Sequence, residues 1–134
     1  MFSQDIIVDS MISFTPATLT DLEFWQIISG AEFCHIVDGG RCVSDGEGDY
    51  GSNENCNIKV LRPLVVTATD FHTEAGYDIL TVAGTQYYGS DGPQGLPLDA
   101  GAELVWTSDD SEFRSGFKVC AAEPGSVGRS MSVA

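Results

Sequence analysis

The chain has 134 residues, 43% of them hydrophobic, and its six basic and twenty acidic residues give a formal charge of −14. This length predicts one domain with a substantial core, and the hydrophobic fraction argues against disorder. Too few cations are present to build the basic patch of a nucleic-acid-binding protein, and binding to anionic membranes is disfavoured for the same reason. The natural counterparts of such a chain are cations or partners with basic surfaces.

Little regular structure is predicted for the N-terminal part of the chain. Residues 1–21 mix apolar and polar side chains without a clear period, and we interpret them as a lead-in with one short strand at 12–14. The apolar run at 22–28 fits a strand or a buried helix by period alone, and Gly30 favours the strand. A second short strand is predicted at 33–37, where an Asp-Gly-Gly turn follows.

The middle of the chain alternates between turn formers and β-branched runs. Acidic and turn-forming residues fill 44–55 and predict an extended loop. The alternating run 56–61 is typical of a half-buried strand, and an Arg-Pro pair ends it. Two further runs, 64–68 and 79–82, have the composition of strands.

The connection between these two runs is acidic. It contains three carboxylates, Asp70, Glu74 and Asp78. Three anions in one turn repel one another, and a hard cation with oxygen ligands would offset that repulsion. The alternative interpretation is an acidic loop solvated by water.

The remaining elements complete an all-β pattern. Strands are predicted at 85–88, 103–107 and 117–121, while Pro97 restricts 96–98 to a sheet edge. Short strands about ten residues apart predict an antiparallel β-sandwich. We assign it to residues 22–122, with a Gly- and Ser-rich tail at 123–134. Its predicted core includes seven apolar residues: Ile58, Val65, Leu80, Val82, Trp106, Phe117 and Val119.

Four cysteines, Cys34, Cys42, Cys56 and Cys120, suit two disulfides and an oxidising compartment. Zinc is the competing interpretation. No pair has CxxC spacing, and the two histidines lie in unrelated contexts, which favours disulfides. The count alone allows three pairings.

The expected location is secreted or extracellular, and no stretch reaches the roughly 18 apolar residues of a membrane span. Residues 1–8 lack the basic and apolar regions of a signal peptide, so we expect a fragment, a mature form or an incomplete gene model.

Four groups of residues occur in the order in which a known family has them. They are the opening Ser44…Tyr50…Cys56-Asn57-Ile58, the centre Phe71-His72-Thr73-Glu74…Tyr77-Asp78-Ile79-Leu80, the step Tyr88-Gly89, and the close Trp106-Thr107-Ser108-Asp109…Gly116-Phe117. From Cys34 to Cys120 the chain therefore resembles a CUB domain, the extracellular β-sandwich module of complement proteases, astacin-like proteases and spermadhesins. It departs from the family at Asp45, Gly46 and Glu47, which replace Pro and Tyr, and it lacks the cysteine that usually precedes Tyr-Asp.

The resemblance implies a jelly-roll sandwich with a calcium ion. In the calcium-binding members the ligands correspond to Glu74, Asp78 and Asp109, and Tyr50 corresponds to the tyrosine that orients the glutamate. Magnesium is disfavoured because it rarely uses an all-protein cage. The family's first disulfide corresponds to Cys34 with Cys56, which leaves Cys42 with Cys120.

Three functions follow as expectations. The first is a non-catalytic module whose calcium-ordered acidic loops bind basic residues of a protein partner, either alone or as an accessory domain of a secreted protease. Its surplus carboxylates are Asp45, Glu47, Asp49, Asp70, Asp110 and Glu112. The second is a carbohydrate-binding β-sandwich that uses exposed aromatic residues, with Trp25, Tyr87 and Tyr88 as candidates. The third is an enzyme, which we disfavour because no nucleophile elbow, HExxH or phosphate loop is present and His72 beside Glu74 suits a surface turn.

Overall fold

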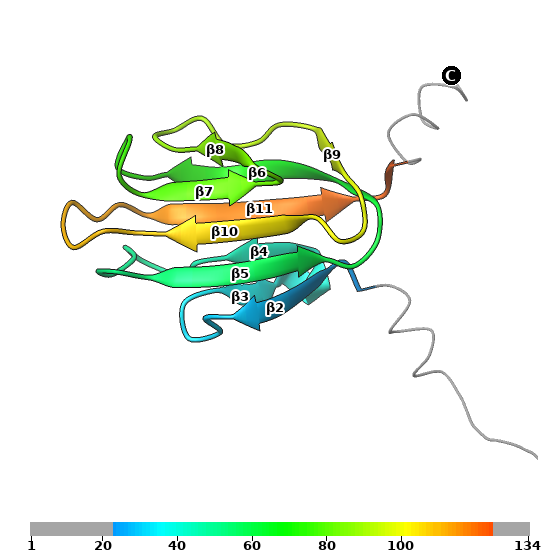
Figure 1. Ribbon diagram of the computed structural model, residues 1–134, viewed down its shortest axis with the longest axis horizontal. Coiled ribbons are helices and arrows are strands. Elements are labelled where there is room, and N and C mark those ends of the chain that lie inside the picture. Colours follow the sequence, from blue (N-terminus) through cyan, green and yellow to red (C-terminus); the bar gives the residue numbers. More distant parts are fainter. Residues whose placement is uncertain (1–22, 125–134) are drawn as a thin grey trace, which may run out of the picture.

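The structure is a computed structural model that describes residues 23–124 as two packed antiparallel sheets (Figure 1). The first sheet has the order β2 (Trp25–Ser29), β5 (Asn55–Val60), β10 (Glu103–Thr107), β7 (Ile79–Val82) and β8 (Thr85–Tyr87). The second has the order β3 (His35–Val37), β4 (Cys42–Ser44), β11 (Gly116–Ala122), β6 (Leu64–His72) and β9 (Leu96–Leu98). A short 3-10 turn, η1 (Asp38–Gly40), joins β3 to β4. The prediction of an all-β antiparallel sandwich is confirmed.

The core lies between the sheets and centres on an aromatic cluster. Trp106 on β10 is fully buried, and its ring packs edge-on against Tyr50, with 5.0 Å between the centroids. The ring of Phe117, on β11, also packs against Trp106, with 5.2 Å between the centroids. Six of the seven predicted core residues are buried, and Val65 is the error. On β6 the side chains of Leu64 and Val66 point inward, so alternation leaves Val65 half-buried on the outer face.

The strand β6 is longer than predicted, and this changes the acidic connection. It continues to His72 because β11 extends the ladder, with Lys118 opposite Asp70 and Gly116 opposite His72. Asp70 therefore lies on a strand, and the interpretation of three carboxylates in one turn is wrong. Only Glu74 and Asp78 belong to the turn.

The other boundaries move by a few residues. Prolines and glycines in the sequence indicated where most strands end. The strand at 103–107 and the edge strand at 96–98 have the predicted bounds. The strand at 33–37 is shortened, because Phe33 and Cys34 form a turn on the carbonyl of Gly30. The strand β4 was not predicted. The predicted strand at 12–14, the lead-in and nearly all of the tail lie outside the described residues.

Two disulfides join the elements as the resemblance implied. Cys34–Cys56 connects the turn before β3 to β5 and so links the two sheets. Cys42–Cys120 joins directly opposed residues of β4 and β11 within one sheet. Both bonds indicate an oxidising environment. Within residues 23–124, no helix has the length and apolar character needed to cross a membrane.

Three connections lie together at one end of the sandwich, at the left of Figure 1. They join β4 to β5, β6 to β7 and β10 to β11. Because neighbouring strands run in opposite directions, segments that are far apart in sequence meet at this end. The predicted ligand residues all lie here.

Candidate metal centre

Tyr50 connects the predicted ligand residues at this end of the sandwich. It comes from the β4–β5 loop, and its buried ring packs on Trp106. Its hydroxyl donates to Oδ2 of Asp78 at 2.5 Å and accepts from the backbone N–H of Glu74 at 3.1 Å. Burial, followed by the hydrogen bond to Asp78, raises the pKa of Tyr50, so the hydroxyl remains a donor. Tyr50 therefore holds the Asp78 side chain directly and touches Glu74 only through its backbone.

Asp78 is fully buried, and both of its carboxylate oxygens are engaged. Oδ2 accepts from Tyr50, and Oδ1 accepts from the backbone N–H of Asp109 at 2.8 Å. A buried carboxylate needs such partners, because desolvation without them is expensive. This arrangement fixes Asp78 and places Asp109, from the β10–β11 connection, beside it.

The turn between β6 and β7 is held by Thr73. Its hydroxyl donates to the Asp78 carbonyl at 2.8 Å and accepts from the N–H of Gly89 at 3.0 Å. The N–H of Asp78 donates to the Glu74 carbonyl at 3.0 Å, which closes the turn. Glu74 and Asp78 are thus the two ends of a short turn that hydrogen bonds close.

The Glu74 carboxylate is held differently. Its Oε1 is buried and has no hydrogen-bond partner among residues 23–124. Burial raises the pKa of Glu74, and the nearby carboxylates of Asp109, Asp78 and Glu112 raise it further. A bound cation would satisfy this oxygen and offset the repulsion.

One carboxylate oxygen from each of Glu74, Asp78 and Asp109 lies within 4.8 Å of the other two. Calcium binds oxygen at about 2.3–2.6 Å, so two ligands on opposite sides of one ion are about 5 Å apart. The three oxygens are therefore close enough to share one ion. The donor set consists only of hard oxygen atoms, which suits calcium or magnesium and disfavours soft metals.

Two residues that sequence reasoning missed support Asp109. Glu54 accepts from the N–H of Gly51 at 2.7 Å and from Nε1 of Trp106 at 3.1 Å. Ser108 donates to the Gly51 carbonyl at 2.7 Å and accepts from the N–H of Glu54 at 2.9 Å. Together these bonds tie the β4–β5 loop to the end of β10, next to Asp109.

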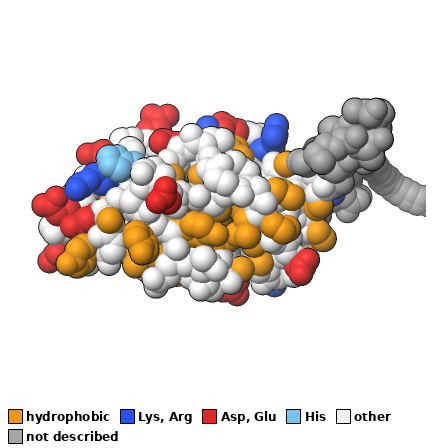
Figure 2. Space-filling view, turned by 90° about the horizontal axis from the view of Figure 1, so that it is seen from above, with side chains coloured by type: hydrophobic (Ala, Val, Ile, Leu, Met, Phe, Trp, Pro, Cys, Tyr) orange, Lys and Arg blue, Asp and Glu red, His pale blue; other side chains and the backbone are white. Residues whose placement is uncertain are grey.

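The surplus carboxylates named from the sequence divide into two groups. Glu47, Asp49, Asp70, Asp110 and Glu112 are exposed, Asp70 on strand β6, whereas Asp45 is buried at the start of the β4–β5 loop. Figure 2 shows acidic side chains gathered at the loop end of the molecule, together with a histidine and a basic side chain. His72 is exposed at the end of β6, and no hydrogen bond links it to the cluster.

The fold and this end of the molecule define a disulfide-linked β-sandwich with an acidic cluster in its loops. No protein-family model, curated protein or solved structure matches the chain. The likeness to CUB domains therefore rests on the ordered residues quoted from the sequence.

Proposed function

We propose that this chain is a non-catalytic, extracellular calcium-binding module that recognises a protein partner through basic residues. One observation carries the proposal: carboxylates from two separate loops converge to within 4.8 Å, and one buried oxygen, Oε1 of Glu74, has no partner within residues 23–124. A solvated acidic surface does not require convergence or burial of this kind.

Calcium fits the site better than magnesium. Glu74, Asp78 and Asp109 would hold the ion, and backbone carbonyls and water would complete a coordination shell of six to eight oxygens. Magnesium demands a near-ideal octahedron and keeps most of its waters. When bound, calcium would neutralise charge and hold the β6–β7 turn against the β10–β11 connection.

The expected partner is basic. Asp110 and Glu112 are exposed on the connection that carries Asp109, and Glu112 is only loosely paired with Arg114 at 3.5 Å. A lysine or arginine of the partner would meet acidic side chains on loops that the ion orders. Metal ligands cannot act as free acids, so these carboxylates favour binding over catalysis. The same module suits an accessory domain of a secreted protease.

Binding to lysine- and arginine-containing peptides, with calcium and with chelator, tests the partner class. Bound calcium reduces the net negative charge of the protein, so it should weaken non-specific attraction to basic peptides. Calcium also orders the loops, so it should strengthen binding that depends on their conformation. We expect calcium to enhance binding. Asp110→Asn should weaken it, whereas Asp99→Asn, an equal change of charge in the β9–β10 connection, should not. Peptides that bind equally in chelator would contradict the proposal.

A carbohydrate-binding function is the second candidate, and one feature favours it. That feature is a hollow of about 290 Å³ that Tyr87 and Tyr88 border. Tyr88 is 43% exposed there. Trp25 is not available for this role, because it is buried and its Nε1 donates to the Arg41 carbonyl. A glycan array would reveal sugar binding, and Tyr88→Ala should abolish it.

A further inference from the structure

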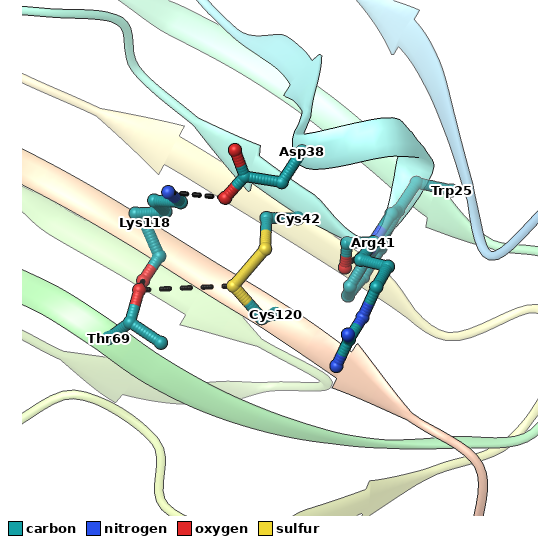
Figure 3. The surroundings of a disulfide bond; sticks show 7 residues. All are labelled: Trp25, Asp38, Arg41, Cys42, Thr69, Lys118 and Cys120. Carbon is teal, nitrogen blue, oxygen red and sulfur yellow. Dashed lines mark hydrogen bonds and ion pairs between the residues drawn. A yellow bond between two sulfur atoms is a disulfide. The ribbon is translucent and has the colours of Figure 1, made fainter.

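The Cys42–Cys120 disulfide lies on the outer face of the second sheet, beside an acidic side chain (Figure 3). The neighbouring residues Val43 and Val119 belong to the core, so strand alternation places both sulfur atoms on the opposite face. A carboxylate oxygen of Asp38, in η1, and the two sulfur atoms all lie within 4.8 Å of one another. This is a second cluster of metal-ligating groups, separate from the loop end.

Polar side chains flank Asp38 and the disulfide. Lys118 lies two residues before Cys120 on β11, and its ammonium group forms an ion pair with Asp38. The hydroxyl of Thr69, on β6, lies 3.8 Å from Sγ of Cys120. Three polar side chains thus lie next to this disulfide, whereas Cys34–Cys56 lies within the hydrophobic core.

We propose that Asp38, Cys42 and Cys120 form a redox-controlled site for Zn²⁺ or a metal ion of similar softness. While the two sulfur atoms are joined, they are poor ligands and the site is closed. A dithiol reductant opens it: the protein S–S bond breaks, the reductant forms its own disulfide, and its two electrons and two protons yield two cysteine thiols. Zinc then displaces both thiol protons into solvent and binds two thiolates and the Asp38 carboxylate, with a fourth position left for water.

The geometry allows this without movement of the sheet. Ligands of tetrahedral zinc lie about 3.3–3.8 Å apart, given Zn–S near 2.3 Å and Zn–O near 2.1 Å. Atoms already within 4.8 Å reach such positions by small side-chain rotations. Backbone pairing holds β11 to β4 at Lys118, Val119 and Cys120 and to β6 along its whole length, so after reduction the backbone should still present the two cysteines opposite each other.

Reduction should be selective for this bond. Cys42 is buried at 4% exposure, but its partner Cys120 is half-buried on the outer face, whereas Cys34 and Cys56 are 1% and 0% exposed within the core. Thiol–disulfide exchange requires access of the attacking thiolate to a sulfur atom. The outer bond is therefore open to a reductant that cannot reach the inner one.

Zinc binding by the whole chain tests the proposal. The protein is reduced with dithiothreitol, freed of it by gel filtration under nitrogen, and mapped by alkylation. We expect Cys42–Cys120 to be open, Cys34–Cys56 to be intact and the circular dichroism spectrum to be unchanged. The reduced protein should bind one more equivalent of Zn²⁺ than the oxidised protein, and Co²⁺ should give a sulfur-to-metal charge-transfer band. The oxidised protein accounts for zinc at the acidic loops, so the result does not depend on the proposed calcium site.

Matched variants identify the ligands. Asp38→Asn should weaken zinc binding at least about tenfold, whereas Asp91→Asn, an exposed acid of another loop, should leave it unchanged. The double variant Cys42→Ser/Cys120→Ser should bind no more zinc than the oxidised protein. The proposal is overturned if reduction adds no zinc equivalent, opens both disulfides together or unfolds the chain. Equal affinity of Asp38→Asn and wild type would also overturn it.

Discussion

Asp45 places a carboxylate inside the sandwich, at a position that corresponds to a proline in the CUB domains that the sequence resembles. Its Oδ1 accepts from the backbone N–H of Phe117 at 2.8 Å, and its Oδ2 is buried without a partner among residues 23–124. The space for this side chain exists because residue 116 is glycine: a Cβ there would lie 2.0 Å from Oδ2. Gly116 also has φ of +93°, a conformation that other residues rarely adopt.

Burial makes the folded state prefer the neutral form of Asp45. Desolvation raises the pKa of Asp45 to about 7, the hydrogen bond from Phe117 opposes the rise, and the carboxylates of Glu54 and Asp70 add to it. In the unfolded chain the pKa is near the ordinary value of 3.8. The folded state therefore binds this proton more tightly. Its contribution to stability is complete below pH 4 and is lost as the pH rises to about 7.

Asp45→Asn should remove this pH dependence. The amide has no charge to desolvate, and its oxygen still accepts from Phe117. Between pH 5 and pH 8 we expect wild type to lose about 2–3 kcal/mol more of its free energy of unfolding than the variant. Urea denaturation at both pH values measures the difference. Asp99→Asn, which changes an exposed acid, is the control and should retain the wild-type slope.

At the scale of the element, β10 joins the core to the loop end. Trp106 is fully buried and packs against Tyr50 and Phe117, and its indole N–H donates to Glu54. The Trp106 side chain thus supports both the packing of the two sheets and the hydrogen bonds of Glu54 that tie the β4–β5 loop to the end of β10.

Two substitutions of Trp106 separate these contributions. Trp106→Ala should lower the free energy of unfolding by about 3–5 kcal/mol, because it leaves a large cavity. Trp106→Phe keeps most of the apolar surface but leaves Oε1 of Glu54 without its donor, which should cost about 1–3 kcal/mol. Chemical denaturation measures both. A Trp106→Ala variant as stable as wild type would show that β10 is not central to the core.

The sequence predicted which segments form strands better than it predicted which of their side chains point inward or where the strands end. Alternation identified β5 because one of its faces is buried and the other is not. The run that forms β7 was recognised by its β-branched composition. Alternation failed at 64–68, where three adjacent apolar residues do not reveal which of them points inward. The end of β6 was also out of reach, because its last three residues are held in the sheet by pairing with distant β11.

The same limit applies to the candidate site. The ordered motifs named Glu74, Asp78, Asp109 and Tyr50, and the structure brings all four to one end. Nothing in the sequence set Glu54 apart from the other acidic residues of its loop, since its role depends on a tryptophan of another strand. Tertiary contacts of this kind become visible only when the sheets are assembled.

At the scale of the whole molecule, the sandwich has two parts: a disulfide-linked core and an end whose loops carry acidic side chains. Two disulfides and the sheets hold the core. The loops at the acidic end are tied to one another by Tyr50, Asp78 and the backbone of Asp109, and their carboxylates repel. The central claim is that a calcium ion offsets this repulsion and stabilises the folded state.

Thermal unfolding of wild type and Asp109→Ala, each with calcium and with chelator, tests this claim most directly. Calcium at a hundredfold excess over its Kd should stabilise wild type by about 2.7 kcal/mol and raise its melting temperature. Asp109→Ala should lose this shift and melt in chelator no lower than wild type, because the backbone N–H that binds Asp78 is kept and one repelling charge is gone. Asp110→Ala, an exposed neighbour, should keep the shift. Four equal melting temperatures for wild type and Asp109→Ala would contradict the account.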